Sequence, residues 1–326
     1  MNEIKKKKIS IISPVYNAAA FLPSFIANLL EYTFQDFEMI FVDNNSSDNS
    51  LQVLHELLPK TNLDYKILTE SNQGSGYARN TGLKSAIGEY VIFIDSDDHI
   101  DKRKLAEDVK LIEKYDVDYV LCRTERKYTD GRTMLQPLEG LDEGIILPPK
   151  AGLIWLKNLF YLQGPGAILA KREIIEYLGG FHTSKTGQDA FLFIKLGLFA
   201  KGYYYNKVYN FYLRHPESTI SNRNKEKNGA LLSYFNLWKN LYNDQLVRSN
   251  KTVMIILENN INSSIFKLHF YGHSIKELFD DSRLKEFKLN FLLFNKISLM
   301  LNKSLSNINY NPFYFIWRKQ KSKYHI

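Results

Sequence analysis

The chain contains 326 residues, of which 44% are hydrophobic, 24% charged and 14% aromatic. Such a composition buries enough apolar surface to offset the entropy lost on folding, so it excludes global disorder and a collagen-like architecture. The length exceeds that of a typical domain and predicts one large core with an appendage, or two unequal domains. The single cysteine, Cys122, excludes an internal disulfide and a Cys-based zinc site, which favours a reducing, cytoplasmic compartment.

Positive charge is concentrated in the last third of the chain. The formal net charge is +8, and residues 225–326 hold 16 Lys and Arg against 7 Asp and Glu, which leaves the first 224 residues at −1. No nucleic-acid partner is expected, because the sequence has no basic recognition helix, zinc finger or aromatic RNA-reading strand. The aromatic run Phe313–Trp317, followed by the basic run Arg318–Lys323, is instead typical of a surface that lies on an anionic membrane.

Neither export nor membrane insertion is expected. The apolar stretch that follows the basic residues 1–8 is broken at Ser13 and Pro14, which makes it too short for a signal peptide. No apolar run approaches the roughly 18 to 20 residues that span a bilayer. We therefore expect a cytoplasmic protein that is peripheral on the inner face of the cell membrane.

Strand-like and helix-like stretches alternate in the first third of the chain. Short β-branched or apolar runs predict strands, and apolar residues three or four apart predict helices. Strands separated by helices imply a parallel sheet with right-handed crossovers. The predicted strands are 9–13, 37–42, 65–68 and 90–94, and the predicted helices are 18–33, 49–58 and 75–85, the second with N-cap candidates at Ser46, Ser47 and Asp48.

The pattern loosens after a further predicted strand at 119–124, where Cys122 is expected to be a buried thiol. From residue 225 onward the pattern is helical, with large apolar residues on one stripe that is typical of a packed face. We expect an α/β domain over residues 1–224 and a basic, aromatic-rich, mainly helical region over 225–326. The intervening predictions are turns at 129–131 and 164–166, strands at 167–170 and 208–213, and helices at 171–177 and 189–200, and the stripe is Leu231, Tyr234, Phe235, Trp238, Leu241 and Tyr242.

Polar residues follow each of the first four predicted strands. In an open α/β sheet the ligand lies at the carboxyl ends of the strands, so these residues predict one shared binding crevice. The four groups are Pro14 to Asn17, Asp43 to Asn45, Glu70 to Gly74, and Asp95 to Asp98.

The strongest chemical signal is the run Asp95-Ser96-Asp97-Asp98. If the preceding strand continues, side chains at i and i+2 point to one face, so Asp95 and Asp97 offer two oxygen donors together. Such a pair suits Mg²⁺ or Mn²⁺. The alternative is a solvated turn in which Asp98 caps a helix that begins near Lys102.

Two further groups predict contacts with a nucleotide. Asp43, at the end of its strand, is placed to accept hydrogen bonds from the N–H of a base, although an N-cap role is the alternative. Small residues from Asn72 to Gly76, with Arg79 one helical turn later, suit close approach of the backbone to a diphosphate and a fixed positive charge beside it. The alternative is an ordinary glycine-rich turn with a surface arginine.

Taken together and in order, four motifs resemble glycosyltransferase family 2. The resemblance is close over about the first hundred residues and looser to about residue 220. It implies an inverting, GT-A fold transferase that takes a nucleotide-diphosphate sugar, with residues 1–100 as the donor half and 101–224 as the acceptor half. The motifs are Pro14-x-Tyr16-Asn17, Val42-Asp43-Asn44-x-Ser46-x-Asp48, Asn72-x-Gly74-x-Gly76-x-Ala78-Arg79-Asn80-x-Gly82, and Phe93-x-Asp95-x-Asp97-Asp98.

The resemblance also implies roles for individual residues. Asp43 is placed near the nucleobase, Asp95 near the ribose or the metal, and Asp97 as the principal metal ligand. Asp189 matches the catalytic base, although Gln188 stands where family members usually have Glu, which puts the type of acceptor in doubt. His215 is expected on the metal or a phosphate, and the donor-binding set is Pro14, Tyr16, Asn17, Asp43, Asn72, Gly74, Arg79, Asp95, Ser96, Arg214 and Ser218.

We therefore expect a Mn²⁺- or Mg²⁺-dependent transferase of cell-envelope polysaccharide biosynthesis. It would move a sugar from a UDP-sugar to a bacterial-type surface glycan or a lipid-linked acceptor. One alternative is a sugar-nucleotide nucleotidyltransferase, which would need a Gly-rich, basic signature after the first strand; another is a catalytically silent scaffold, against which the intact Asp95, Asp97 and Asp189 argue. The C-terminal region is expected to contact the membrane, the acceptor, the catalytic domain or another subunit, and a homo-oligomer is left open.

Overall fold

The computed structural model of the chain describes residues 7–215, 228–271 and 273. Two compact units divide the chain, Met1–Ser218 and Thr219–Ile326, and each is considered by itself. The boundary predicted near residue 224 falls outside the described residues.

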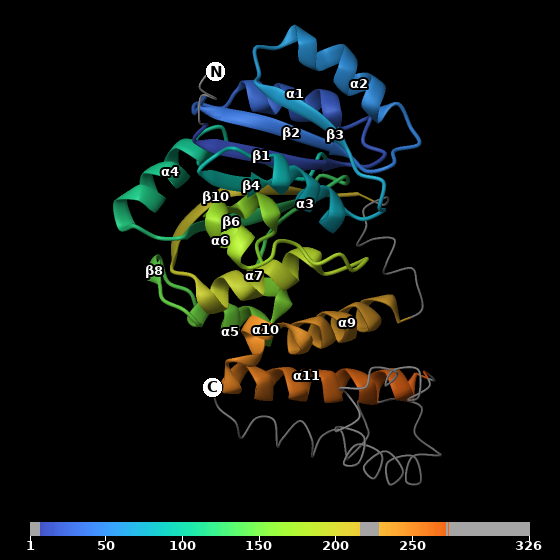
Figure 1. The fold of residues 1–326 in the computed structure, drawn as a ribbon, viewed down its shortest axis with the longest axis vertical. Coiled ribbons are helices and arrows are strands. Elements are labelled where there is room, and N and C mark those ends of the chain that lie inside the picture. The colour runs from blue at the N-terminus through green and yellow to red at the C-terminus, as the bar shows by residue number, and fades with distance from the viewer. Residues whose placement is uncertain (1–6, 216–227, 272, 274–326) are drawn as a thin grey trace. The chain divides into compact units, whose positions relative to one another are not determined.

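The first unit is an α/β domain built on one ten-stranded mixed sheet (Figure 1), whose main path runs in the order β3-β2-β1-β4-β9-β6-β10-β5. Its strands are β1 Ile9–Val15, β2 Phe37–Asp43, β3 Tyr65–Thr69, β4 Tyr90–Phe93, β5 His99–Ile100, β6 Tyr119–Tyr128, β7 Thr133–Leu135, β8 Gly144–Ile146, β9 Ile168–Lys171 and β10 Gly202–Arg214. Its α-helices are α1 Leu22–Leu30, α2 Ser50–Leu57, α3 Ser75–Ser85, α4 Lys104–Tyr115, α5 Lys150–Lys157, α6 Arg172–Tyr177 and α7 Gln188–Phe199, with short 3₁₀ turns at Leu58–Lys60, Leu159–Tyr161 and Pro165–Ala167.

The centre of the sheet is buried on both faces. All residues of β2 and β4 are buried, and in β1 only Pro14 is partly exposed. Near-continuous apolar runs of this kind are what parallel strands need when helices cover both faces, and α1 and α2 lie on one side of the sheet while α3 lies on the other (Figure 1). The predicted alternation of strands and helices in the first third is confirmed, as is the buried thiol of Cys122.

One strand runs against the others in the middle of the sheet. β9 pairs antiparallel with both β4 and β6, whereas β1 pairs parallel with β2 and β4, and β10 pairs parallel with β6. Two reversals cancel, so β6 and β10 point the same way as β1 to β4. The carboxyl ends of six strands, β1 to β4, β6 and β10, therefore lie along one edge of the sheet.

Two helix starts differ from the sequence-based expectation. Asn49, not Ser46 to Asp48, is the N-cap residue of α2. Helix α4 begins at Lys104 with Arg103 at its N-cap, so Asp98 does not cap it.

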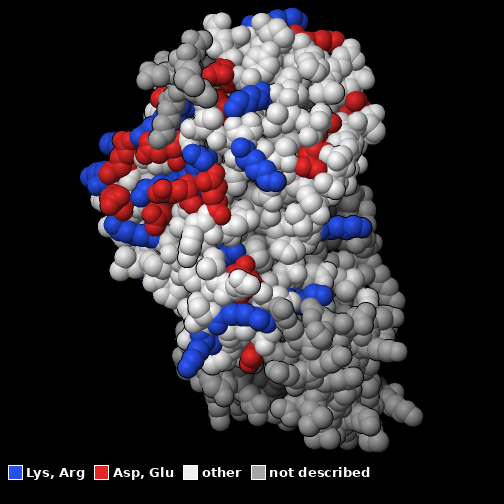
Figure 2. All heavy atoms as spheres, viewed as in Figure 1, with Lys and Arg blue, Asp and Glu red and all other residues white. Residues whose placement is uncertain are grey.

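Acidic and basic side chains alternate over the exposed surface of α4 (Figure 2), which is typical of a solvated helix face.

The second unit is helical in its described part. It contains α9 Gly229–Asn243, α10 Gln245–Arg248 and α11 Lys251–Phe270, and α9 packs against α11. The predicted stripe on α9 contributes Phe235, Trp238 and Leu241 to this core, while α11 supplies residues three or four apart that are fully buried, namely Val253, Leu257, Ile261, Ile265 and Leu268. None of the helices in the described part of the chain is long and apolar enough to cross a membrane.

Candidate active site

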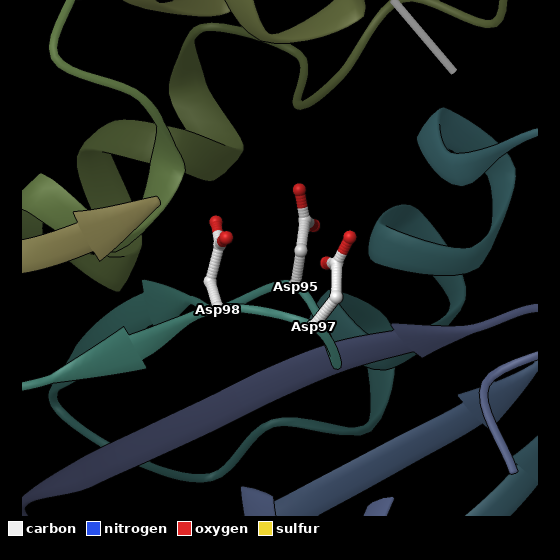
Figure 3. A group of neighbouring side chains, drawn as sticks. All are labelled: Asp95, Asp97 and Asp98. Carbon is white, nitrogen blue, oxygen red and sulfur yellow. The ribbon is translucent and has the colours of Figure 1, made fainter. Parts of the chain in front are cut away.

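Three carboxylates gather on the loop after β4, and we call Asp95, Asp97 and Asp98 the acid cluster. One oxygen from each lies within 4.8 Å of the others, and the three side chains rise from the same stretch of loop (Figure 3). The strand itself ends at Phe93, so strand alternation is not what brings them together. A turn does so, in which the Asp98 backbone N–H donates to the Asp95 carbonyl oxygen at 2.9 Å.

Asp98 ties the acid cluster to the end of β10. Its side chain is 3% exposed, and one carboxylate oxygen accepts a hydrogen bond from the backbone N–H of Leu213 at 3.0 Å. This contact joins residues that are more than a hundred positions apart and holds Arg214 and His215 next to the loop of the acid cluster. The predicted helix-capping alternative for Asp98 is therefore wrong, because β5 intervenes between Asp98 and α4.

The acid cluster favours a bound cation. Burial and the neighbouring Asp95 carboxylate raise the pKa of Asp97, and burial together with Asp97 and Asp95 raises the pKa of Asp98 well above its usual value. Three hard oxygen donors whose mutual repulsion is relieved by positive charge fit Mn²⁺ or Mg²⁺, both of which prefer carboxylate ligands. The residues present therefore match the metal that the sequence predicts.

His215 lies against the loop that carries the acid cluster. Its Nε2 is 3.0 Å from a carboxylate oxygen of Asp97, and its ring centroid is 4.9 Å from that of Phe21. The structure thus brings together two of the three residues proposed as metal ligands on the sequence, Asp97 and His215. It places the third, Asp95, in the same cluster.

Arg79 is buried rather than on the surface. It is 4% exposed, its guanidinium pairs with Asp95 and donates to the Ser75 hydroxyl at 3.3 Å, and it lies 5.1 Å from the ring centre of Phe181. The surface-arginine alternative is wrong. Helix α3 uses Arg79 to hold the Asp95 carboxylate in place, so its effect on a ligand passes through Asp95.

The end of β2 offers an open acceptor. Asp43 is 8% exposed, and one of its carboxylate oxygens is buried with no hydrogen-bond partner. The other oxygen is 3.4 Å from the backbone N–H of Ser46. A buried carboxylate oxygen without a donor is costly unless a ligand supplies one, which is what an N–H of a nucleobase would do.

Asn44 shapes the wall beside Asp43, a role that the sequence analysis missed. Its amide donates to the carbonyl oxygens of Glu70 at 2.8 Å and Asn72 at 2.7 Å, and its carbonyl oxygen accepts from the Gly74 N–H at 2.7 Å. Gly74 has φ of 139°, a conformation open to glycine, and leads directly into α3. Only the position of Asn44 at a strand end signalled this role.

The remaining predicted donor residues line the same edge. Pro14 lies near the end of β1 beside Val42, and Tyr16, just beyond, is 55% exposed. The side chain of Asn17 is held in place by its amide oxygen, which accepts a hydrogen bond from the Ser47 N–H at 2.8 Å. The backbone and side-chain amides of Asn72 donate to the Glu70 carboxylate. Ser96 is buried in the loop that carries the acid cluster. Ser218 lies outside the described residues.

Asp189 is the second residue of α7. Gly187 is the N-cap residue, in the left-handed conformation, and Gln188 is the first residue of the helix, so the predicted N-cap role of Asp189 is wrong. Helix α7 approaches α3 where a Cβ on Gly76 would overlap the His182 carbonyl oxygen and press on the Gln188 side chain. Gln188 is buried and donates to the Ser184 carbonyl at 2.7 Å, a bond that a Glu carboxylate cannot make.

Comparison with known proteins identifies the family. The sequence model of glycosyl transferase family 2 matches residues 10–179. The chain belongs to glycosyltransferase family 2. A Haemophilus influenzae relative described as an uncharacterised glycosyltransferase is 38% identical over 174 residues, which are 52% of this chain and 64% of that protein.

A second relative matches almost end to end. The Staphylococcus aureus poly(ribitol-phosphate) β-N-acetylglucosaminyltransferase TarP is 26% identical over 308 residues, or 91% of this chain and 89% of TarP. Several relatives are longer than the aligned region: this chain spans 64% of the Haemophilus protein and 23% of TarS. The family assignment therefore rests on the domain over residues 10–179.

Solved structures confirm the GT-A fold of this transferase. Residues 1–349 of Staphylococcus aureus TarS with UDP-GlcNAc superpose with a TM-score of 0.60 at 21% identity, covering 87% of this chain and 79% of that one. A Pyrobaculum calidifontis mannosyltransferase with GDP-Man and Mn²⁺ has a TM-score of 0.54 at 16% identity, covering 98% and 88%. At these identities the likeness concerns the fold.

Proposed function

We propose that this family 2 member is an inverting glycosyltransferase that moves a sugar from a UDP-sugar to a hydroxyl group of a surface glycan, a teichoic-acid-like polymer or a lipid-linked acceptor. The observation that carries the proposal is the acid cluster at the carboxyl end of β4. It lies on the same edge as the open carboxylate oxygen of Asp43 at the end of β2. One nucleotide bridges both sites, with the base at Asp43 and the diphosphate at the acid cluster.

The choice of a uridine donor is supported by two observations. Asp43 presents an acceptor with no protein donor, which suits the ring N–H of uracil, and Tyr16 presents an exposed ring beside it. The TarS structure that shares this fold contains UDP-GlcNAc. We expect the same class of donor here.

The residues that would hold the metal are Asp97 and Asp95, with His215 beside Asp97 at 3.0 Å. A divalent cation bound there supplies positive charge to the diphosphate as it departs. Arg79 keeps the Asp95 carboxylate oriented toward the cation. The mannosyltransferase of the same fold contains Mn²⁺.

Asp189 is the proposed catalytic base. Its carboxylate accepts the proton of the acceptor hydroxyl as the oxygen attacks the anomeric carbon. The new carbon–oxygen bond forms on the face opposite the one that breaks, the bond to the diphosphate oxygen takes its electron pair with it, and the nucleoside diphosphate leaves. No enzyme nucleophile is required, so a single base is enough for inversion.

The direct test is donor turnover by the full chain. A panel of UDP- and GDP-sugars is screened for thermal stabilisation and for metal-dependent hydrolysis, with Mn²⁺ and with EDTA. We expect UDP-sugars to stabilise the protein, hydrolysis to stop with EDTA, and Asp97→Asn to lower turnover at least about 100-fold, because it removes a charged ligand.

Asp130→Asn is the matched control, because Asp130 is an exposed carboxylate that pairs with Arg132 on a surface turn. It should leave turnover unchanged. Undiminished turnover in EDTA contradicts the metal assignment, and no response to any nucleotide sugar contradicts the donor class.

A further inference from the structure

Two arginines lie side by side on one face of β6 and β10, and we call Arg126 and Arg214 the arginine pair. The register places Arg126 beside Tyr212 and Tyr128 beside Arg214. Residues two apart in a strand share a face, so the two arginines and the two tyrosines occupy the same patch. Burial and the nearby Arg214 guanidinium lower the pKa of Arg126, as expected when two cations are held together.

The arginine pair has no carboxylate partner among the described residues. Nε of Arg126 is buried without a hydrogen-bond acceptor, and the guanidinium of Arg214 lies 5.0 Å from the ring centre of Tyr212 with Nη1 3.5 Å from its hydroxyl oxygen. By contrast, four other arginines are paired with acids, namely Arg79, Arg103, Arg132 and Arg172. Two adjacent cations that lack an acid are stabilised by an external anion.

The arginine pair lies beyond the acid cluster from the predicted nucleotide site. In the sheet order the ends of β3, β2 and β1 precede β4, and those of β6 and β10 follow it. The hydrogen bond from the Leu213 N–H to Asp98 holds the end of β10 against the metal-binding loop. His215, the residue after Arg214, has its Nε2 3.0 Å from a carboxylate oxygen of Asp97, so the end of β10 that carries Arg214 lies next to the acid cluster.

We propose that Arg126 and Arg214 form a phosphate subsite for the acceptor, so that the acceptor is a phosphate-bearing polyol or glycan. For Arg214 this role replaces the donor contact that the family resemblance implied. The inference rests on the proposed function, because it takes the nucleotide to occupy the other side of the acid cluster. Guanidinium groups present planar forks of N–H donors that match phosphate oxygens. The subsite holds the acceptor by its phosphate while a nearby hydroxyl reaches the transferred sugar.

The test separates acceptor phosphate from donor diphosphate. Binding of three probes to the full chain is measured by calorimetry: a short synthetic ribitol-phosphate oligomer, the same polyol without phosphate, and UDP with Mn²⁺. For Arg126→Gln we expect affinity for the phosphate oligomer to fall about 10- to 100-fold, the loss of one or two charge-assisted hydrogen bonds. Affinity for UDP should stay within about twofold.

Arg132→Gln is the matched control, since it removes the same charge from an exposed arginine on the adjoining hairpin; it should leave all three affinities unchanged. If Arg126→Gln fails to fold, Arg126→Lys keeps the charge but loses the fork, and an intermediate loss for the phosphate oligomer is expected.

Other results overturn the inference. An equal loss of UDP affinity assigns the pair to the donor diphosphate, and an unchanged affinity for the phosphate oligomer removes the subsite altogether. If the unmodified protein binds phosphorylated and unphosphorylated polyol equally well, the phosphate subsite is also ruled out. If that protein binds no UDP, the proposed function fails, while the oligomer comparison still reports on the subsite.

Discussion

At the scale of single residues, Asp97 and Asp189 lie in different surroundings, which suit the different roles proposed for them. Burial and the neighbouring Asp95 carboxylate raise the pKa of Asp97, which also contacts His215, so Asp97 is suited to a cation. Asp189 lies in the first turn of α7, outside the acid cluster. The two carboxylates can therefore be separated by mutation.

Replacing Asp189 by Asn is expected to abolish transfer but not donor binding. The amide keeps the shape of the side chain and cannot accept a proton, so kcat should fall by about three orders of magnitude. Calorimetry with UDP and a transfer assay measure the two effects on the same sample. A parallel collapse of UDP affinity would place Asp189 in the donor site.

Two buried tyrosines differ in whether their hydroxyl groups have a hydrogen-bond partner, so removing the hydroxyl is expected to change the stability in opposite directions. The Tyr119 hydroxyl is buried and has no hydrogen-bond partner, whereas the Tyr205 hydroxyl donates to Asp108 at 2.5 Å. Tyr119→Phe should stabilise the domain by about 1 kcal/mol, and Tyr205→Phe should destabilise it by about 2 kcal/mol, because the buried Asp108 loses a donor. Chemical denaturation measures both; a stabilising Tyr205→Phe would contradict the argument.

The same tyrosine predicts a loss of stability at alkaline pH. Burial raises the pKa of Tyr119 above the usual 10.0, so the unfolded chain loses the phenol proton while the folded chain keeps it. The ionisation of Tyr119 therefore leaves the stability unchanged below pH 10 and lowers it as the pH rises further. Unfolding curves between pH 9 and pH 11 should therefore diverge for Tyr119→Phe, with the variant less sensitive to alkali.

At the scale of elements, α3 and α7 come close together and carry residues for which donor and acceptor roles are proposed. Gly76 allows it, since a Cβ there would overlap the backbone carbonyl oxygen of His182. Helix α3 carries Arg79, which holds Asp95, and α7 carries Asp189. The spacing of these two helices therefore sets the position of Asp189, the proposed base, relative to the loop of the acid cluster.

Gly76→Ala should lower kcat by about 10- to 100-fold with a smaller effect on UDP affinity. The added methyl group pushes the two helices apart, and a displacement of about 1 Å misplaces the base. Ser75→Ala, one residue earlier, is the control, because it adds no volume at the contact and removes only the 3.3 Å hydrogen bond to Arg79. Equal activity of Gly76→Ala and the unmodified protein would show that the helix spacing does not matter.

At the scale of the whole molecule, the uneven charge separates two roles. The first 224 residues are nearly neutral, while residues 225–326 carry a net charge of +9. In the described part of the second unit the large apolar stripes pack together, as expected for a helical core. The aromatic and basic run at 313–323 lies outside the described residues, and its proposed role at an anionic membrane stays a prediction.

Binding to anionic liposomes tests that role. Full-length protein should bind vesicles that contain phosphatidylglycerol and release them as salt rises, because each Lys or Arg near an anionic surface contributes about 1 kcal/mol. Deletion of residues 313–326 should abolish binding without changing UDP affinity. If the deletion leaves vesicle binding intact but dissolves an oligomer, the segment packs against another subunit instead.

The sequence by itself determined the alternating elements of the first third and the polar residues at their ends. Apolar runs, helical spacing and small residues at turns are local properties, so strands β1 to β4, the family motifs and the proximity of Asp95 and Asp97 could be predicted without a structure. Local patterns also predicted that Cys122 is buried and that the apolar stripe of α9 packs.

Only the tertiary structure decided which of these residues meet. Because β9 pairs antiparallel with both β4 and β6, strands β6 and β10 run in the same direction as β4, and the arginine pair lies at the same edge of the sheet as the acid cluster. Asp98 accepts a hydrogen bond from the Leu213 N–H instead of capping a helix, and Arg79 forms an ion pair with Asp95. Such partners are chosen by sheet order and by the need to satisfy buried charges, and neither leaves a periodic trace along the chain.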